Sequence, residues 1–150
     1  MLCENAERNL TQILNSVKDE ETFRDRMNEL MRLRNISAPE LQRNADIDRR
    51  LFSKINGKKN YRVSKNTALA IAIGLQLDYA EACDLIARAG YALSPANRAD
   101  LIVRYFLENR EKFFREEANK NQYKVPVLND ILMEHGEEVL GYSRNIKISV

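Results

Sequence analysis

Along most of the chain, apolar residues recur every three or four positions, which is the spacing of one face of an α-helix. The first segment with this spacing covers residues 4–18, and a second begins near Thr22 after the polar stretch VKDEET. Only 5 glycines and 3 prolines interrupt the chain, which favours helices over a turn-rich all-β fold. The pattern therefore predicts an all-α protein with about seven or eight short helices.

Helix-capping residues divide the central part of the chain into two short helices. Ser37 and Glu40 have the spacing of a capping box, and Pro39 is tolerated in the first turn that follows. A tight turn at Asp46 leads to a second helix, for which Asp48 is the expected N-cap. The residues of these two helices that are predicted to face inward are Leu41, Ala45, Leu51, Phe52 and Ile55.

Glycines mark the expected ends of the helices that follow. Gly57 is expected to end the second short helix in the left-handed conformation, which glycine adopts readily. The apolar stretch NTALAIAIGLQL predicts a helix that ends near Gly74. The next predicted helix is capped by Asp78 and closed by Gly90.

The C-terminal part of the chain predicts two more helices and a tail. Ser94 is the expected cap of the first, with Pro95 in its first turn. Residues 108–124 are charged and lose the periodicity, which predicts a linker or a frayed helix extension, and VLNDILMEHG predicts a short final helix. Apolar residues alternate in the tail at 146–150, which is typical of an added strand or a loose end. The expected inward face of the first helix consists of Leu101, Ile102, Tyr105 and Phe106.

Two short helices joined by a tight turn, the second of them basic, are typical of a helix-turn-helix. The major groove of DNA admits one α-helix, so a recognition helix has to be braced by a second helix packed across it. The second helix places polar and basic residues on the face opposite Phe52 and Ile55, and a basic loop follows it. The predicted DNA-binding residues are Arg49, Arg50, Ser53, Lys54, Asn56, Lys58, Lys59, Asn60, Tyr61 and Arg62.

Positive charge is concentrated on this motif. Residues 48–65 carry seven Lys or Arg and one Asp, a balance of +6, whereas the chain as a whole has a formal charge of +2 and the remainder therefore −4. Such a stretch predicts contact with nucleic acid, and its alternative is a basic surface that faces only solvent. Tyr61 could equally touch DNA or pack over its loop.

Residues 27–78 resemble the Xre/Cro-type helix-turn-helix domain of phage repressors. The shared features, in order, are a Ser that opens the first motif helix, a Leu inside it, a short turn, the tripeptide SKI, an NGK loop and the support helix LAIAIGLQLDYAEA. The resemblance implies a five-helix repressor-like core, with an N-terminal helix before it and additional C-terminal helices after it. It also implies that residues 48–56 form the recognition helix of a small bacterial or phage regulator.

The expected division of the chain follows from this core. We expect an N-terminal amphipathic helix at 1–20, a helix-turn-helix domain at 21–92, a helical extension at 93–142 and a tail at 143–150. Since a helix-turn-helix module needs only about half of such a chain, the extra apolar helices are expected to bury against something. A second copy is the first choice, which gives a homodimer, and a protein partner bound through the N- or C-terminal helices is the other.

Two functions are compatible with the motif. The first is a sequence-specific double-stranded DNA-binding transcriptional regulator of the repressor type, which acts by occupying an operator. The alternative is a helix-turn-helix adaptor or inhibitor that binds proteins within a toxin–antitoxin or phage-defence system. The chain departs from the usual family pattern at Ala38 and Pro39, where a Gln often contacts phosphate, and at Asp48, where Ser or Thr is common. These departures favour the alternative, and the basic stretch favours the regulator.

Other classes of function find little support in the residues. No nucleotide-binding, nucleophile-elbow or zinc-protease motif is present, so we expect no enzymatic activity, no catalytic residues, no metal site and no cofactor. Cys3 and Cys83 lack metal-ligand spacing and are interpreted as reduced thiols, and the sole histidine, His135, as a helix-end residue. The polar start and the absence of an apolar run of about 18 residues predict a cytoplasmic protein without membrane contact.

Overall fold

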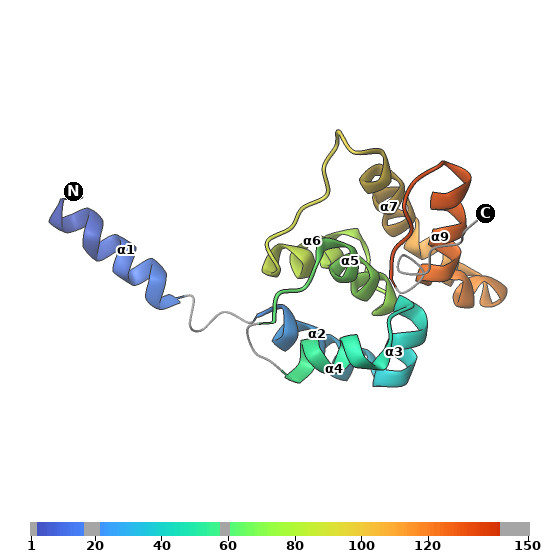
Figure 1. The fold of residues 1–150 in the computed structure, drawn as a ribbon, viewed down its shortest axis with the longest axis horizontal. Coiled ribbons are helices and arrows are strands. Elements are labelled where there is room, and N and C mark those ends of the chain that lie inside the picture. The colour runs from blue at the N-terminus through green and yellow to red at the C-terminus, as the bar shows by residue number, and fades with distance from the viewer. Residues whose placement is uncertain (1–2, 17–21, 58–60, 142–150) are drawn as a thin grey trace.

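The computed structural model describes residues 3–16, 22–57 and 61–141, and within these ranges every regular element is helical (Figure 1). The all-α prediction is therefore confirmed. The elements are α1 (Glu4–Ser16), α2 (Phe23–Arg34), α3 (Ala38–Ala45), α4 (Arg49–Gly57), α5 (Lys65–Gly74), α6 (Tyr79–Arg88), α7 (Arg98–Glu108), α8 (Arg110–Arg115), the 3₁₀ helix η2 (Glu117–Gln122) and α9 (Val125–Glu134). The expected strand at 146–150 lies outside the described residues.

α5 runs through the centre of the helical body (Figure 1). Every residue from Thr67 to Gly74 is buried, because the sequence TALAIAIG offers no polar face to solvent. A helix that is apolar on all sides has to be covered on all sides, and α3, α6 and α9 pack against it. The core of the protein is therefore organised around α5.

α3 approaches α5 at Gly74 more closely than a side chain there would allow. A Cβ atom at Gly74 would lie 2.8 Å from the Cβ atom of Ala45 and 2.8 Å from Cδ1 of Leu41. Glycine is needed at this position because the two helix backbones are almost in contact. Since α4 follows α3 after a short turn, this contact also fixes the place of α4.

The capping residues expected around the motif are in place. The Ser37 hydroxyl accepts a hydrogen bond from the Glu40 amide at 3.3 Å, and an Asp48 carboxylate oxygen accepts one from the Leu51 amide at 2.7 Å. Asp46 makes the turn between α3 and α4 in the left-handed conformation, with φ of 52°. The two short helices and their turn are therefore confirmed. Asp46 tolerates this φ because a short polar side chain costs less there than a branched or bulky one.

The expected start of α7 and the expected conformation at the end of α4 are wrong. α4 ends at Gly57, as expected, but the φ of Gly57 lies outside the left-handed region. α7 begins at Arg98 and not near Ser94, because residues 94–97 form a turn in which the Asn97 amide donates to the Ser94 carbonyl oxygen at 3.3 Å. Its N-cap is Asn97, whose side chain accepts a hydrogen bond from the Asp100 amide at 3.0 Å.

The expected inward face of α7 is also only partly right. Phe106 is buried as predicted, whereas Leu101 is 45% exposed and Tyr105 is 70% exposed. Val103 and Leu107 face the core in their place. α7 carries apolar residues on two faces, so the periodicity alone did not identify the one that packs inward.

Of the two alternatives expected for residues 108–124, a linker or a helix extension, the structure shows further helices after α7. α8 and η2 occupy most of this stretch, and Phe113 packs against both Phe106 and Tyr123 with ring centroids 5.0 and 5.5 Å apart. The buried Tyr123 hydroxyl donates to the carbonyl oxygen of Leu77, and burial raises the pKa of this phenol above its usual value. The aromatic side chains thus pack this stretch against the core, although most of its residues are charged or polar.

A buried carboxylate joins the C-terminal helices to the central helix. Asp100, only 5% exposed, accepts hydrogen bonds from the Lys65 ammonium at 2.6 Å and from the Ser94 amide at 2.8 Å. Lys65 is the first residue of α5 and Asp100 lies in the first turn of α7. The pair therefore fixes the start of α7 against the start of α5.

In the described part of the chain, no helix is both long and apolar enough to cross a membrane.

We expect Gly74→Ala to destabilise the protein by about 1–3 kcal/mol, because its methyl group overlaps Ala45 and Leu41. The matched control is Gly57→Ala, where an added Cβ meets nothing within 4 Å and the residue is helical. That change should stabilise by about 0.5–1 kcal/mol through the lower entropy of the unfolded chain. Urea unfolding of both variants measures the difference, and equal effects would contradict the close α3–α5 contact.

We expect Asp100→Ala to cost about 2–3 kcal/mol of unfolding free energy, because it leaves the Ser94 amide and the partly buried Lys65 ammonium without their acceptor. The control is Glu108→Ala, which removes the exposed ion pair with Arg104 and should change stability by less than about 0.5 kcal/mol. Thermal unfolding followed by circular dichroism compares the two. Similar losses would show that Asp100 has no special structural role.

Candidate nucleic-acid interface

α4 presents to solvent the face that the sequence predicted. Phe52 and Ile55 are buried against the core, so the other side of the helix points away from it. All five predicted residues on this helix are exposed, namely Arg49, Arg50, Ser53, Lys54 and Asn56. In the segment that leads to α5, Arg62 is exposed and Tyr61 is half-buried. Lys58, Lys59 and Asn60 lie outside the described residues.

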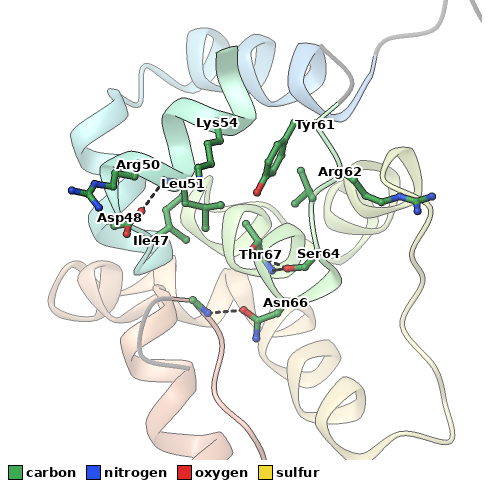
Figure 2. Close-up of a pocket in the computed structure, with 12 residues that line it drawn as sticks. Ile47, Asp48, Arg50, Leu51, Lys54, Tyr61, Arg62, Ser64, Asn66 and Thr67 are labelled. Atoms are coloured by element: carbon green, nitrogen blue, oxygen red, sulfur yellow. Dashed lines mark hydrogen bonds between the residues drawn. The ribbon is translucent and has the colours of Figure 1, made fainter. Parts of the chain in front are cut away.

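A hollow of about 700 Å³ separates α4 from the start of α5 (Figure 2). It brings together four of the predicted residues: Arg50 and Lys54 from α4, and Tyr61 and Arg62 from the segment before α5. Arg49, Ser53 and Asn56 do not line it. The predicted residues thus divide between the hollow and the adjoining face of α4.

Figure 2 shows how the side chains around the hollow are directed. Arg50 and Arg62 point outward on opposite sides, and the Tyr61 ring lies between α4 and α5 with its hydroxyl toward α5. The hollow carries three cations, Arg50, Lys54 and Arg62, against one carboxylate, Asp48. This surplus favours an anionic partner such as a phosphate backbone.

Asp48 is held as a helix cap. One of its carboxylate oxygens accepts the Leu51 amide at 2.7 Å, which places the negative charge beside the positive end of the α4 dipole. That interaction offsets part of the repulsion that an exposed carboxylate would exert on a phosphate. The N-terminus of α4 is thus satisfied by its own side chain, and attraction for DNA has to come from the neighbouring cations.

Asn56 has a partner within the protein. Its side-chain oxygen accepts a hydrogen bond from the side-chain amide nitrogen of Asn28, in α2, at 2.8 Å. This contact ties the end of α4 to α2. The residue was predicted to bind DNA, and the structure gives it at least this second role.

The other side of the hollow consists of residues that the sequence did not single out. The Ser64 hydroxyl accepts a hydrogen bond from the Thr67 amide at 3.1 Å and caps α5. Asn66 donates to the Val139 carbonyl at 3.0 Å and accepts from the Gly141 amide at 2.9 Å. The Ser64 cap could have been recognised from its spacing to Thr67, whereas no local signal marks Asn66, because its partners lie more than seventy residues away.

Gly141 brings the C-terminal segment to the turn of the motif. Its φ is +73°, and a Cβ atom there would lie 2.7 Å from the Ala45 carbonyl oxygen and 2.5 Å from that of Asp46. Asn129 of α9 holds the adjacent residue, Leu140, with two hydrogen bonds of 2.8 and 3.0 Å. The C-terminal segment therefore packs on the α3–α4 turn and closes one end of the hollow.

Comparison with known protein families identifies this unit. Residues 26–88 match the family model of the Cro/C1-type HTH DNA-binding domain. The chain contains a Cro/C1-type helix-turn-helix domain. The match covers nearly all of α2 and continues to the end of α6, which confirms the resemblance seen in the sequence. Searches of curated proteins and of solved structures give no match.

The matched range includes α3, α4 and the turn between them, and α4 carries the exposed basic face. Residues 1–25 and 89–150 are not covered by the match. Within the part of the chain that the structure describes, no group of three His, Cys, Asp or Glu side chains could hold a metal ion.

We expect Lys54→Ala to weaken DNA binding at all sequences and to reduce the salt slope of log K by about 1, because one phosphate contact is lost. Asn56→Ala serves as the comparison, since its side chain bonds to Asn28 and does not line the hollow. It should affect DNA affinity less and cost about 0.5–1 kcal/mol of stability. Fluorescence anisotropy at several salt concentrations measures both. A larger loss for Asn56→Ala would place the DNA on the α2 side of α4.

Proposed function

We propose that the protein is a sequence-specific double-stranded DNA-binding transcriptional regulator of the repressor type, which works as a homodimer by occupying an operator. The observation that carries this proposal is the exposed basic face of α4 within a Cro/C1-type domain. The recognition helix of this proposal, residues 48–56, includes all of α4 except its last residue.

Side chains of α4 have the chemistry for reading base pairs. Arg49 and Arg50 lie in its first turn and are exposed, and an Arg guanidinium can form two hydrogen bonds with a guanine edge in the major groove. Ser53, one turn further on, is also exposed and can bond to a base or a phosphate. Each good two-pronged contact supplies roughly 1–3 kcal/mol of discrimination between base pairs.

The hollow beside α4 suits the phosphate backbone that borders the groove. Lys54 and Arg62 line it from its two sides, and Tyr61 offers a hydroxyl between them. Lys58 and Lys59, which lie outside the described residues, are further predicted contacts. Four to six phosphate contacts would give log K a slope of about −4 to −5 against log salt concentration, at roughly −0.9 per contact. The hollow thus supplies affinity and position, and α4 supplies specificity.

A homodimer would place two recognition helices on successive major grooves. Half-sites of such an operator are about 34 Å apart, one turn of DNA, and their sequence is palindromic because the protein pair has a two-fold axis. The exposed apolar side chains of α1 and α7 are consistent with self-association. Occupancy of such a site next to a promoter would exclude the transcription machinery.

A second candidate function is protein binding, as an adaptor or inhibitor in a toxin–antitoxin or phage-defence system. The same exposed apolar residues favour it, since they would suit a protein partner as well as a second copy. Under this function the basic face of α4 would bind no DNA. Charge reversal on α4 therefore distinguishes the two.

We expect the double change Arg49→Glu with Arg50→Glu to lower DNA affinity by more than about 100-fold, because two contacts are lost and two repulsions are introduced. The matched control, Arg115→Glu with Lys120→Glu, reverses two exposed charges on α8 and η2. It should change affinity little. Titration against a fluorescent pool of genomic fragments at several salt concentrations measures the effect and reveals any enriched palindrome. Unchanged affinity in the α4 variant would overturn the assignment of the recognition helix.

A further inference from the structure

Two apolar surfaces of the described chain are left uncovered, and the first is a face of α1. Ala6, Leu10, Ile13 and Leu14 share one side of this helix. Leu10 is 43% exposed, Ile13 61% and Leu14 58%, and no residue of α1 is buried. In Figure 1 the helix lies apart from the others. A short amphipathic helix is stable mainly when its apolar face packs on something, so α1 lacks the contact that it needs.

The second uncovered surface is an apolar groove between α7, α8 and α9. It has a volume of about 310 Å³, and its apolar side chains are Leu101, Ile102, Tyr105, Phe106, Phe113 and Ile131. Asn109 and His135 are the polar residues that line it. This groove contains the residues of α7 that were expected to face inward, which explains why the outer face of α7 is so apolar.

We propose that α1 of one copy lies in the α7–α9 groove of a second copy, and that the second copy returns the same contact. The lengths are compatible: the apolar residues of α1 from Ala6 to Leu14 span about 12 Å, and the groove residues from Leu101 to Asn109 span about 12 Å as well. A third helix laid between two others packs at the usual 8–10 Å from each. This inference rests on the proposed function, of which it supplies the dimer contact.

The length of chain between α1 and α2 favours a second copy over the same one. Six steps from Ser16 to Thr22 reach at most about 22 Å, whereas a domain of this size is about 35 Å across. Figure 1 shows α1 on one side of the molecule and α7 and α9 on the other, with α2, α5 and α6 between them. Insertion of α1 into a neighbouring molecule avoids this long path around its own body.

The area that would be buried favours exchange over a simple pairing of two α1 helices. One face of α1 covers a flat footprint of roughly 20 by 10 Å, so a single contact buries about 400 Å² when both sides are counted. A specific dimer needs about 1,200–2,000 Å². Pairing α1 with its twin supplies the contact once, whereas exchange supplies it twice by symmetry and also brings the two helical bodies together. Only exchange approaches the area of a stable interface.

Sedimentation of the full-length chain at micromolar concentration tests the inference. Wild type should be a dimer, and two independent variants should each weaken it at least tenfold: Leu10→Asp with Ile13→Asp on α1, and Tyr105→Asp in the groove. All three side chains are exposed, so each variant should keep the helical content of wild type. The control is Asn5→Asp with Gln12→Asp, which adds the same two charges to the polar side of α1 and should leave the dimer intact.

Crosslinking distinguishes exchange from pairing of the two α1 helices. In a Cys3→Ser, Cys83→Ala background, one chain carries Ala6→Cys and the other Leu101→Cys, and the mixture is treated with a short bis-maleimide. Crosslinks should form in the mixture and not with the Ala6→Cys chain alone. Crosslinks in that chain alone, or a monomeric wild type, would overturn the inference. A monomer that still binds DNA would leave the DNA-binding proposal standing, and a dimer that binds none would leave the exchange standing.

Discussion

The near-contact of α3 with α5 at Gly74 is the constraint on which the rest of the structure depends. α5 is buried on all sides, so every other helix of the body is placed with respect to it. Without a side chain at Gly74, α3 can lie directly on this central helix, and Leu41 and Ala45 fill the interface. α4 then leaves α3 through a turn made by Asp46 and begins at its Asp48 cap. The position of the basic helix α4 therefore depends on the lack of a side chain at Gly74, a buried residue.

The C-terminal part of the chain packs against the helix-turn-helix unit and is joined to it by several contacts. The Lys65–Asp100 pair fixes α7 to the start of α5, and Gly141 rests on the carbonyl oxygens of the α3–α4 turn. The Asn66 side chain donates a hydrogen bond to the Val139 carbonyl oxygen and accepts one from the Gly141 amide. These contacts converge on the turn and on the start of α5, which are the parts that border the hollow. Any change that loosens the C-terminal half should therefore first alter the hollow beside α4.

Local chemistry made much of the fold predictable from the sequence. The Ser37 and Asp48 caps, the apolar run of α5 and the alternation of buried and basic residues on α4 depend on residues a few positions apart. The structure departs from prediction where contacts between residues far apart in the sequence determine which side chains are buried. α7 has two apolar faces, and only its packing partners select the one with Val103 and Leu107. Tyr123 likewise orders the charged stretch before it through a carbonyl of Leu77, forty-six residues away.

The candidate site divides in the same way. The residues of α4 followed from the face opposite Phe52 and Ile55, so their exposure could be predicted. The hollow could not, because Asn66 and Gly141 enter it through pairings across more than seventy residues. The same long-range packing leaves α7, which lines the apolar groove, and α4, which carries the basic face, on opposite sides of α5 (Figure 1). The two surfaces would bind through different interactions, because phosphate contacts weaken with salt while apolar contacts do not. A molecule so arranged can pair with a second copy through one surface and leave the other free for DNA.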